Sequence, residues 1–167
     1  MVCKRAQERT ARIMLKKQLI LLTTLLLLLI HGTAAAANWQ WVYSDEDVGL
    51  FFDTNSIKFQ RIAKGGVDKN IIYVWARYVY GYTYAQKHPH NGQIVKMVVL
   101  YEKMDIGTDT VTDLERVFYN NSGDFIDALK KGTVYHVVPG SYGDMLYSAI
   151  KEYARIHSEE ITDRSLR

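Results

Sequence analysis

The chain has 167 residues, a formal net charge of +3 at pH 7 and one cysteine, Cys3. Residues 1–37 carry six Lys or Arg and one Glu, whereas the rest carries 15 Lys or Arg and 17 Asp or Glu. The positive charge therefore belongs to the N-terminal segment, which argues against a nucleic-acid partner, and a lone cysteine excludes an internal disulfide.

The N-terminal segment has the pattern of a secretory signal peptide. Two lysines precede an apolar run over residues 19–30, and four consecutive alanines end at Ala37. This pattern predicts export, with residues 1–37 removed, and Met14 is an alternative start. An apolar run of about 12 residues is too short to span a membrane, which disfavours an uncleaved anchor. No stable membrane span is therefore expected after cleavage.

Residues 38–157 are expected to form one domain built mainly from β-strands. Nothing alternates as strand, helix, strand, so the sheet should be antiparallel. Residues 81–92 are expected to form a loop, and 111–119 a strand, although a short helix is the alternative there. Segments rich in β-branched and aromatic residues predict strands at 39–43, 50–53 (resuming at 57–59), 70–80, 93–104, 111–119, 124–129 and 133–138.

One amphipathic helix is predicted over residues 141–156. Pro139 ends the preceding strand because it lacks an N–H, and Ser141 is a favourable N-cap. The apolar stripe of this helix comprises Tyr142, Met145, Leu146, Ala149, Ile150, Tyr153 and Ala154. The expected class is α+β, with six or seven mainly antiparallel strands and this C-terminal helix packed on them. Residues 158–167 are charged and are expected to fray.

Five short segments give the mature region a family resemblance. They are Trp39 with Trp41, F-F-D-T-N-S-I (Phe51–Ile57), V-W-A-R (Val74–Arg77), Y-N-N-S-G-D (Tyr119–Asp124) and V-P-G-S-Y-G-D-M-L-Y (Val138–Tyr147). In this order they resemble the bacterial surface-adhesin protein E-like domain family. The resemblance implies an extracytoplasmic domain with a helix across an antiparallel sheet, and adhesins of the family bind host extracellular-matrix proteins.

The chain departs from this family at two points. Family adhesins tie the helix to the sheet with a disulfide, and some are lipoproteins. Neither is possible here, because the only cysteine, Cys3, lies within the expected signal peptide. The helix is therefore expected to be held by packing, and a lipid anchor is not expected.

Four tyrosines form the main candidate binding surface. Tyr78, Tyr80, Tyr82 and Tyr84 would share one face if the strand continued through Gly81. Tyrosine combines apolar area with a polar tip, which suits contact with a protein or a sugar. The alternative is that Tyr78 and Tyr80 pack in or beside the core while the other two lie on a loop.

Other polar residues favour structural roles. Asp53 ends an apolar strand, and its carboxylate is expected to accept N–H bonds from the following turn. His88 and His90 are too few ligands for a metal site, and no further ligand can be assigned to them. Ser141 has no assignable histidine or aspartate partner, so no catalytic group is expected.

The sequence therefore predicts an exported, adhesin-like binding protein without cofactor or metal, and not an enzyme. Its expected location is the periplasm, the cell envelope or the extracellular space. The expected partner is a protein, either a host matrix protein or an envelope component, contacted through the sheet surface. The alternative is a periplasmic or envelope-associated domain with a structural or accessory role and without adhesin activity.

Overall fold

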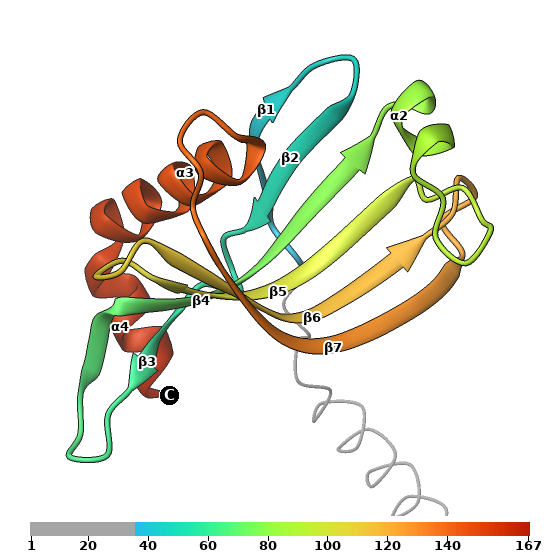
Figure 1. Ribbon diagram of the computed structural model, residues 1–167. Helices are drawn as coiled ribbons and strands as arrows, with labels where there is room; N and C mark the ends of the chain where they lie inside the picture. The colour runs from blue at the N-terminus through green and yellow to red at the C-terminus, as the bar shows by residue number, and fades with distance from the viewer. Residues whose placement is uncertain (1–35) are drawn as a thin grey trace, which may run out of the picture. The chain divides into compact units, whose positions relative to one another are not determined.

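The computed structural model describes residues 36–167, which form a curved sheet with helices on one face (Figure 1). The predicted signal peptide, except for its last two residues, lies outside this range. The elements are β1 Trp39–Ser44, β2 Val48–Asp53, β3 Lys58–Arg61, β4 Val67–Tyr80, α2 Tyr82–Lys87, β5 Met97–Asp105, β6 Thr110–Tyr119, β7 Phe125–His136, α3 Tyr142–Ile156 and α4 Ser158–Leu166.

The strands follow one another across the sheet in nearly their chain order. The path is β1-β2-β4-β5-β6-β7, and every neighbouring pair is antiparallel. β3 pairs with the first half of β4, and β2 pairs with the second half. The predicted α+β class and antiparallel sheet are confirmed, with seven strands.

A turn at Asp53 separates β2 from β3. The Asp53 Oδ1 atom accepts hydrogen bonds from the backbone N–H of Asn38 at 2.8 Å and of Asn55 at 3.0 Å. Ser56 Oγ accepts a bond of 2.9 Å from the N–H of Trp75 on β4. Side chains thus satisfy backbone groups where the ladder is interrupted, which keeps the two strand pieces on the same edge of β4.

α3 and α4 cover only part of one sheet face. Ile72, Val74 and Ala76 on β4 lie under these helices and pack with Leu146 and Ile150 of α3. Tyr78 and Tyr80 point to the same side of β4, because side chains on a strand alternate between faces. They contact a second apolar cluster of Val95, Val98, Leu100 and Phe118. One concave face therefore carries two clusters, and the helices cover the first.

The start of α3 is fixed by local hydrogen bonds. Ser141 Oγ accepts the backbone N–H of Asp144 at 3.1 Å, and the Asp144 carboxylate accepts the N–H of Gly140 at 2.9 Å. Pro139 lies between β7 and this cap, outside both elements. Gly140 has a φ of 77°, a conformation that favours glycine at this break.

Packing and two tyrosine hydroxyls hold α3 without a disulfide. Tyr142 donates to Asp45 at 2.7 Å, and Tyr147 donates to Asp109 at 2.9 Å. The ring of Tyr153 meets Phe52 of β2 edge to face, with centroids 5.4 Å apart. No helix among residues 36–167 is both long and apolar enough to cross a membrane.

The predicted frayed tail at 158–167 is wrong, because residues 158–166 form a docked helix, α4. Ile161 is 0% exposed and belongs to the main core. Ser165 Oγ accepts the N–H of Phe59 on β3 at 2.8 Å. Glu159, Glu160 and Asp163 are exposed, whereas Arg164 reaches back and donates to the backbone carbonyl of Thr54. The segment is therefore a short amphipathic helix, although its composition is mostly charged and polar.

Three other boundaries differ from prediction. The loop expected at 81–92 contains α2, and β5 begins at Met97 rather than at residue 93. The strands expected at 124–129 and 133–138 are one strand, β7, that spans the predicted turn at 130–132. The pairing of β7 with β6 is irregular at these residues, so the turn-forming sequence bends the strand locally and does not end it.

Candidate functional site

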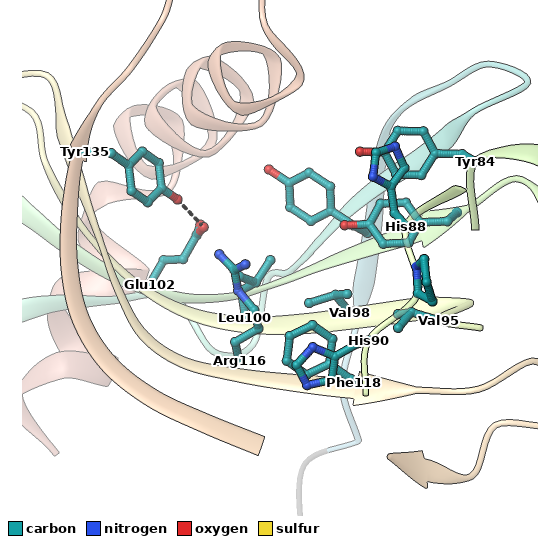
Figure 2. A pocket seen from close by; sticks show the side chains of 13 residues that line it. Tyr84, His88, His90, Val95, Val98, Leu100, Glu102, Arg116, Phe118 and Tyr135 are labelled. Carbon is teal, nitrogen blue, oxygen red and sulfur yellow. Dashed lines mark hydrogen bonds between the residues drawn. The ribbon is translucent and has the colours of Figure 1, made fainter. Parts of the chain in front are cut away.

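A cavity of about 360 Å³ occupies the part of the concave face that α3 and α4 leave uncovered (Figure 2). Strands β4 to β7 supply its floor and sides, and the segment from α2 to β5 supplies its rim. The lining residues are Tyr78, Tyr80, Tyr84, His88, Pro89, His90, Val95, Val98, Leu100, Glu102, Arg116, Phe118 and Tyr135. This volume lies within the range of pockets that bind small ligands.

Three of the four predicted tyrosines meet at the cavity. Tyr78 and Tyr80 come from β4, and Tyr84 comes from α2, with its ring 4.9 Å from that of Tyr80. Tyr82 does not line the cavity and is 72% exposed. Because the strand ends at Tyr80, residues 82 and 84 follow helical geometry and point in different directions. The prediction of one continuous stripe is therefore wrong for Tyr82.

A close backbone approach fixes where α2 begins. A Cβ atom at Gly81 would lie 1.9 Å from the carbonyl oxygen of Glu46. Only glycine fits this contact, and the N–H of Gly81 donates to the carbonyl of Asp47 at 2.7 Å. The β1–β2 loop thereby positions α2 and, with it, Tyr84.

The two histidines stand on the rim in separate settings. The ring of His88 packs against that of Tyr84 in a tilted arrangement, with centroids 4.3 Å apart. His90 stacks on Phe118 at 3.9 Å, and its Nε2 lies 2.8 Å from Asp127 Oδ2 on β7. The rim is therefore joined to β7. Among residues 36–167, no group of three or more His, Cys, Asp or Glu side chains could hold a metal ion.

Glu102 is the buried acidic group of the cavity. It is 4% exposed, and its Oε1 accepts a hydrogen bond of 3.0 Å from the hydroxyl of Tyr135 (Figure 2). Burial raises the pKa of Glu102 to about 7, and nearby Asp113 adds to the rise, while the Tyr135 bond and Arg116 oppose it. Burial also raises the pKa of Tyr78, and partial burial next to Glu102 raises the pKa of Tyr135.

Arg116 and Asp113 form an ion pair on β6. Arg116 Nη2 donates to Asp113 Oδ2 at 2.5 Å, and Asp113 is 3% exposed. The two residues stand three apart yet interact because the pairing of β6 is irregular on both sides near Leu114. Asp113 Oδ1 and Arg116 Nε are buried without a hydrogen-bond partner.

The sequence identified the tyrosines of this site but missed Glu102, Arg116 and Tyr135. A signal for Glu102 exists, because its neighbours on the same strand face are apolar at Leu100 and Met104. A charge within such an alternating apolar row indicates a buried polar group. No comparable signal exists for Arg116, whose position depends on the irregular strand pairing.

The opposite face of the sheet carries a rival aromatic surface. Trp75 and Tyr73 of β4 both stack with Tyr101 of β5, at centroid distances of 5.0 and 6.1 Å. The Arg77 guanidinium lies 4.5 Å from the ring centroids of both Trp39 and Phe51. These groups already face one another, so their contacts serve to stabilise the sheet.

No protein-family model matches the sequence, and none of the curated proteins matches it. Among solved structures, the chain is similar to the crystal structure of protein E from non-typeable Haemophilus influenzae. The identity is 12%, the TM-score is 0.44, and the match covers 80% of this chain and 91% of that chain. A likeness at this level establishes neither family membership nor a function for this chain.

Proposed function

We propose that the protein is an exported, non-enzymatic binding protein whose concave cavity receives a segment of a partner protein. Export rests on the signal-peptide pattern of residues 1–37. The observation that carries the binding role is the aromatic cavity on the part of the concave face not covered by helices. A concavity lined by aromatic rings and a few polar groups is typical of binding sites.

The position of β7 favours a polypeptide as the partner. β7 is the last strand of the sheet, so its outer backbone groups have no strand partner among residues 36–167. Residues 132–136 of this strand are all exposed. Tyr135 belongs to this edge and also lines the cavity. A segment paired along β7 would therefore place side chains toward the cavity.

The proposed role as a binding protein without catalysis draws support from how the polar groups are used. The Ser141 hydroxyl caps α3, and His90 pairs with Asp127. Neither group forms a nucleophile–base pair with the other, as covalent catalysis would require. A host matrix protein or another envelope component could each supply the bound segment.

Selection from a random peptide library on the folded domain tests this function. The enriched peptides are then titrated against the wild-type protein, Tyr84→Ala and Tyr82→Ala. Tyr84 lines the cavity, whereas Tyr82 lies on the same helix outside it. Tyr84→Ala should weaken binding by about tenfold or more, as expected for an aromatic residue central to an interface. Tyr82→Ala should leave the affinity within about twofold.

The proposal fails if no peptide is enriched, or if the two variants bind the enriched peptides equally well. Amide spectra of both variants show whether each is folded. Because the substitutions are the same and lie two residues apart, any general effect of losing a tyrosine from α2 is shared.

A further inference from the structure

The charges around the cavity are unbalanced. Glu102 and Asp113 are both buried, whereas Arg116 supplies the one guanidinium among the described residues that line the cavity. Arg116 donates to Asp113. Among the described side chains, Glu102 has Tyr135 as its hydrogen-bond partner and forms no ion pair. A buried carboxylate without a cation is costly, and a ligand that supplies one is favoured.

The walls suit a cation carried on an apolar stem. Tyr78, Tyr80 and Tyr84 offer aromatic rings, and Val98 and Leu100 offer apolar surface in the same cavity as Glu102. In Figure 2, Val98 and Leu100 lie between Tyr84 and Glu102. Aromatic faces attract cations, and apolar walls accept methylene groups. Lysine and arginine combine both parts in one side chain.

We propose that the cavity binds a lysine or arginine side chain of the partner segment, with its charged end at Glu102 and its stem against the tyrosines. This inference rests on the proposed function and names the residue by which the partner is recognised. The bond of Glu102 to Tyr135 leaves the second carboxylate oxygen for the incoming cation. Arg116 stays paired with Asp113. It therefore repels an incoming lysine or arginine less strongly than an unpaired guanidinium would.

Titration with single-residue probes tests the inference. The probes are Nα-acetyl-arginine amide, the uncharged Nα-acetyl-citrulline amide and Nα-acetyl-glutamate amide, followed through backbone amide shifts of the wild-type domain. The arginine probe should bind about tenfold more tightly than citrulline, as expected for a charge-assisted hydrogen bond, and should shift amides around the cavity.

A pair of variants assigns the preference to one carboxylate. Glu102→Gln should bind the arginine and citrulline probes equally. Glu152→Gln should keep the wild-type preference, because Glu152 lies on the exposed side of α3 and pairs with Arg155. The wild-type comparison needs no variant, so a folding defect in Glu102→Gln does not prevent the test.

The inference is overturned if citrulline binds as well as arginine, if glutamate binds best, or if no probe shifts the cavity amides. A preference for glutamate would identify Arg116 as the anchoring group instead. Its failure is distinct from failure of the proposed function. Library peptides that depend on Tyr84 but lack lysine and arginine would leave the function standing without this anchor. Arginine binding without any Tyr84-dependent peptide would support the cation site while the proposed function fails.

Discussion

Glu102 shows how a single position joins the fold to the proposed binding role. It stands on β5 between Leu100 and Met104, where its strand face is otherwise apolar. One hydrogen bond from Tyr135 does not replace the water that burial removes. The carboxyl group therefore retains its proton to a higher pH than usual, which makes folding stability depend on pH.

Replacing Glu102 with Gln should remove this pH dependence. The pKa of Glu102 rises from 4.5 to about 7 on folding, so the folded state holds more protons between these values. The free energy of unfolding therefore falls as pH rises through this window, by about 3 kcal/mol for this group alone. Urea unfolding at pH about 4.5 and about 8 should show Glu102→Gln gaining on the wild type at the higher pH.

The lowered pKa of Asp45 does not disturb this comparison. Its value of about 2, caused mainly by the hydrogen bond from Tyr142, places its effect below the window. The change in unfolding free energy between the two pH values is measured for each protein. When the two changes are subtracted, the contributions of ionisable groups that both proteins share cancel. Equal pH dependence in the wild type and Glu102→Gln would contradict the account of this buried carboxyl.

Of the two C-terminal helices, α3 is much easier to predict from the sequence than α4. α3 carries a long apolar stripe, a serine cap and a preceding proline, and all three signals agree. α4 has only nine residues and buries a single large apolar side chain, Ile161. Its helix depends on tertiary contacts, among them the bond between Ser165 and Phe59, which local patterns do not encode.

Truncating Ile161 to Ala should cost about 2–5 kcal/mol of unfolding free energy, because it empties a fully buried site. Ile156→Ala is the matched control, since Ile156 at the end of α3 is 62% exposed and should change stability by less than about 0.5 kcal/mol. Urea midpoints at constant slope measure both changes. Equal effects of the two substitutions would show that residues 158–166 are frayed and not docked on the core.

The sheet was predictable in its strands but not in its pairing details. Aromatic and β-branched runs marked the strands, and turn residues marked most of their ends. The irregular pairing around Leu114 left no clear signal, and the turn residues at 130–132 of β7 were interpreted as a break between two strands. These irregularities bring Asp113 and Arg116 together, which explains why the tyrosines of the cavity could be predicted while its charged groups could not.

At the scale of the whole described domain, incomplete coverage of one sheet face creates the site. The apolar stripe of α3 predicted that a helix lies on the sheet, but no stripe states how much of the sheet it covers. α3 contacts β1 and β2, and α4 contacts β3 and β4. The second cluster, around Val98 and Phe118, is therefore left beside the cavity. Long-range pairing, not local sequence, decides this division.

The most direct measurement is a map of backbone amide shifts on the wild-type domain bound to an enriched library peptide. We expect shifts at Tyr78, Tyr80 and Leu100, together with β7 around Tyr135, because these residues line the cavity and its edge. Shifts centred instead on the opposite face, at Tyr73 and its neighbours, would contradict it and identify the outer aromatic row as the binding surface.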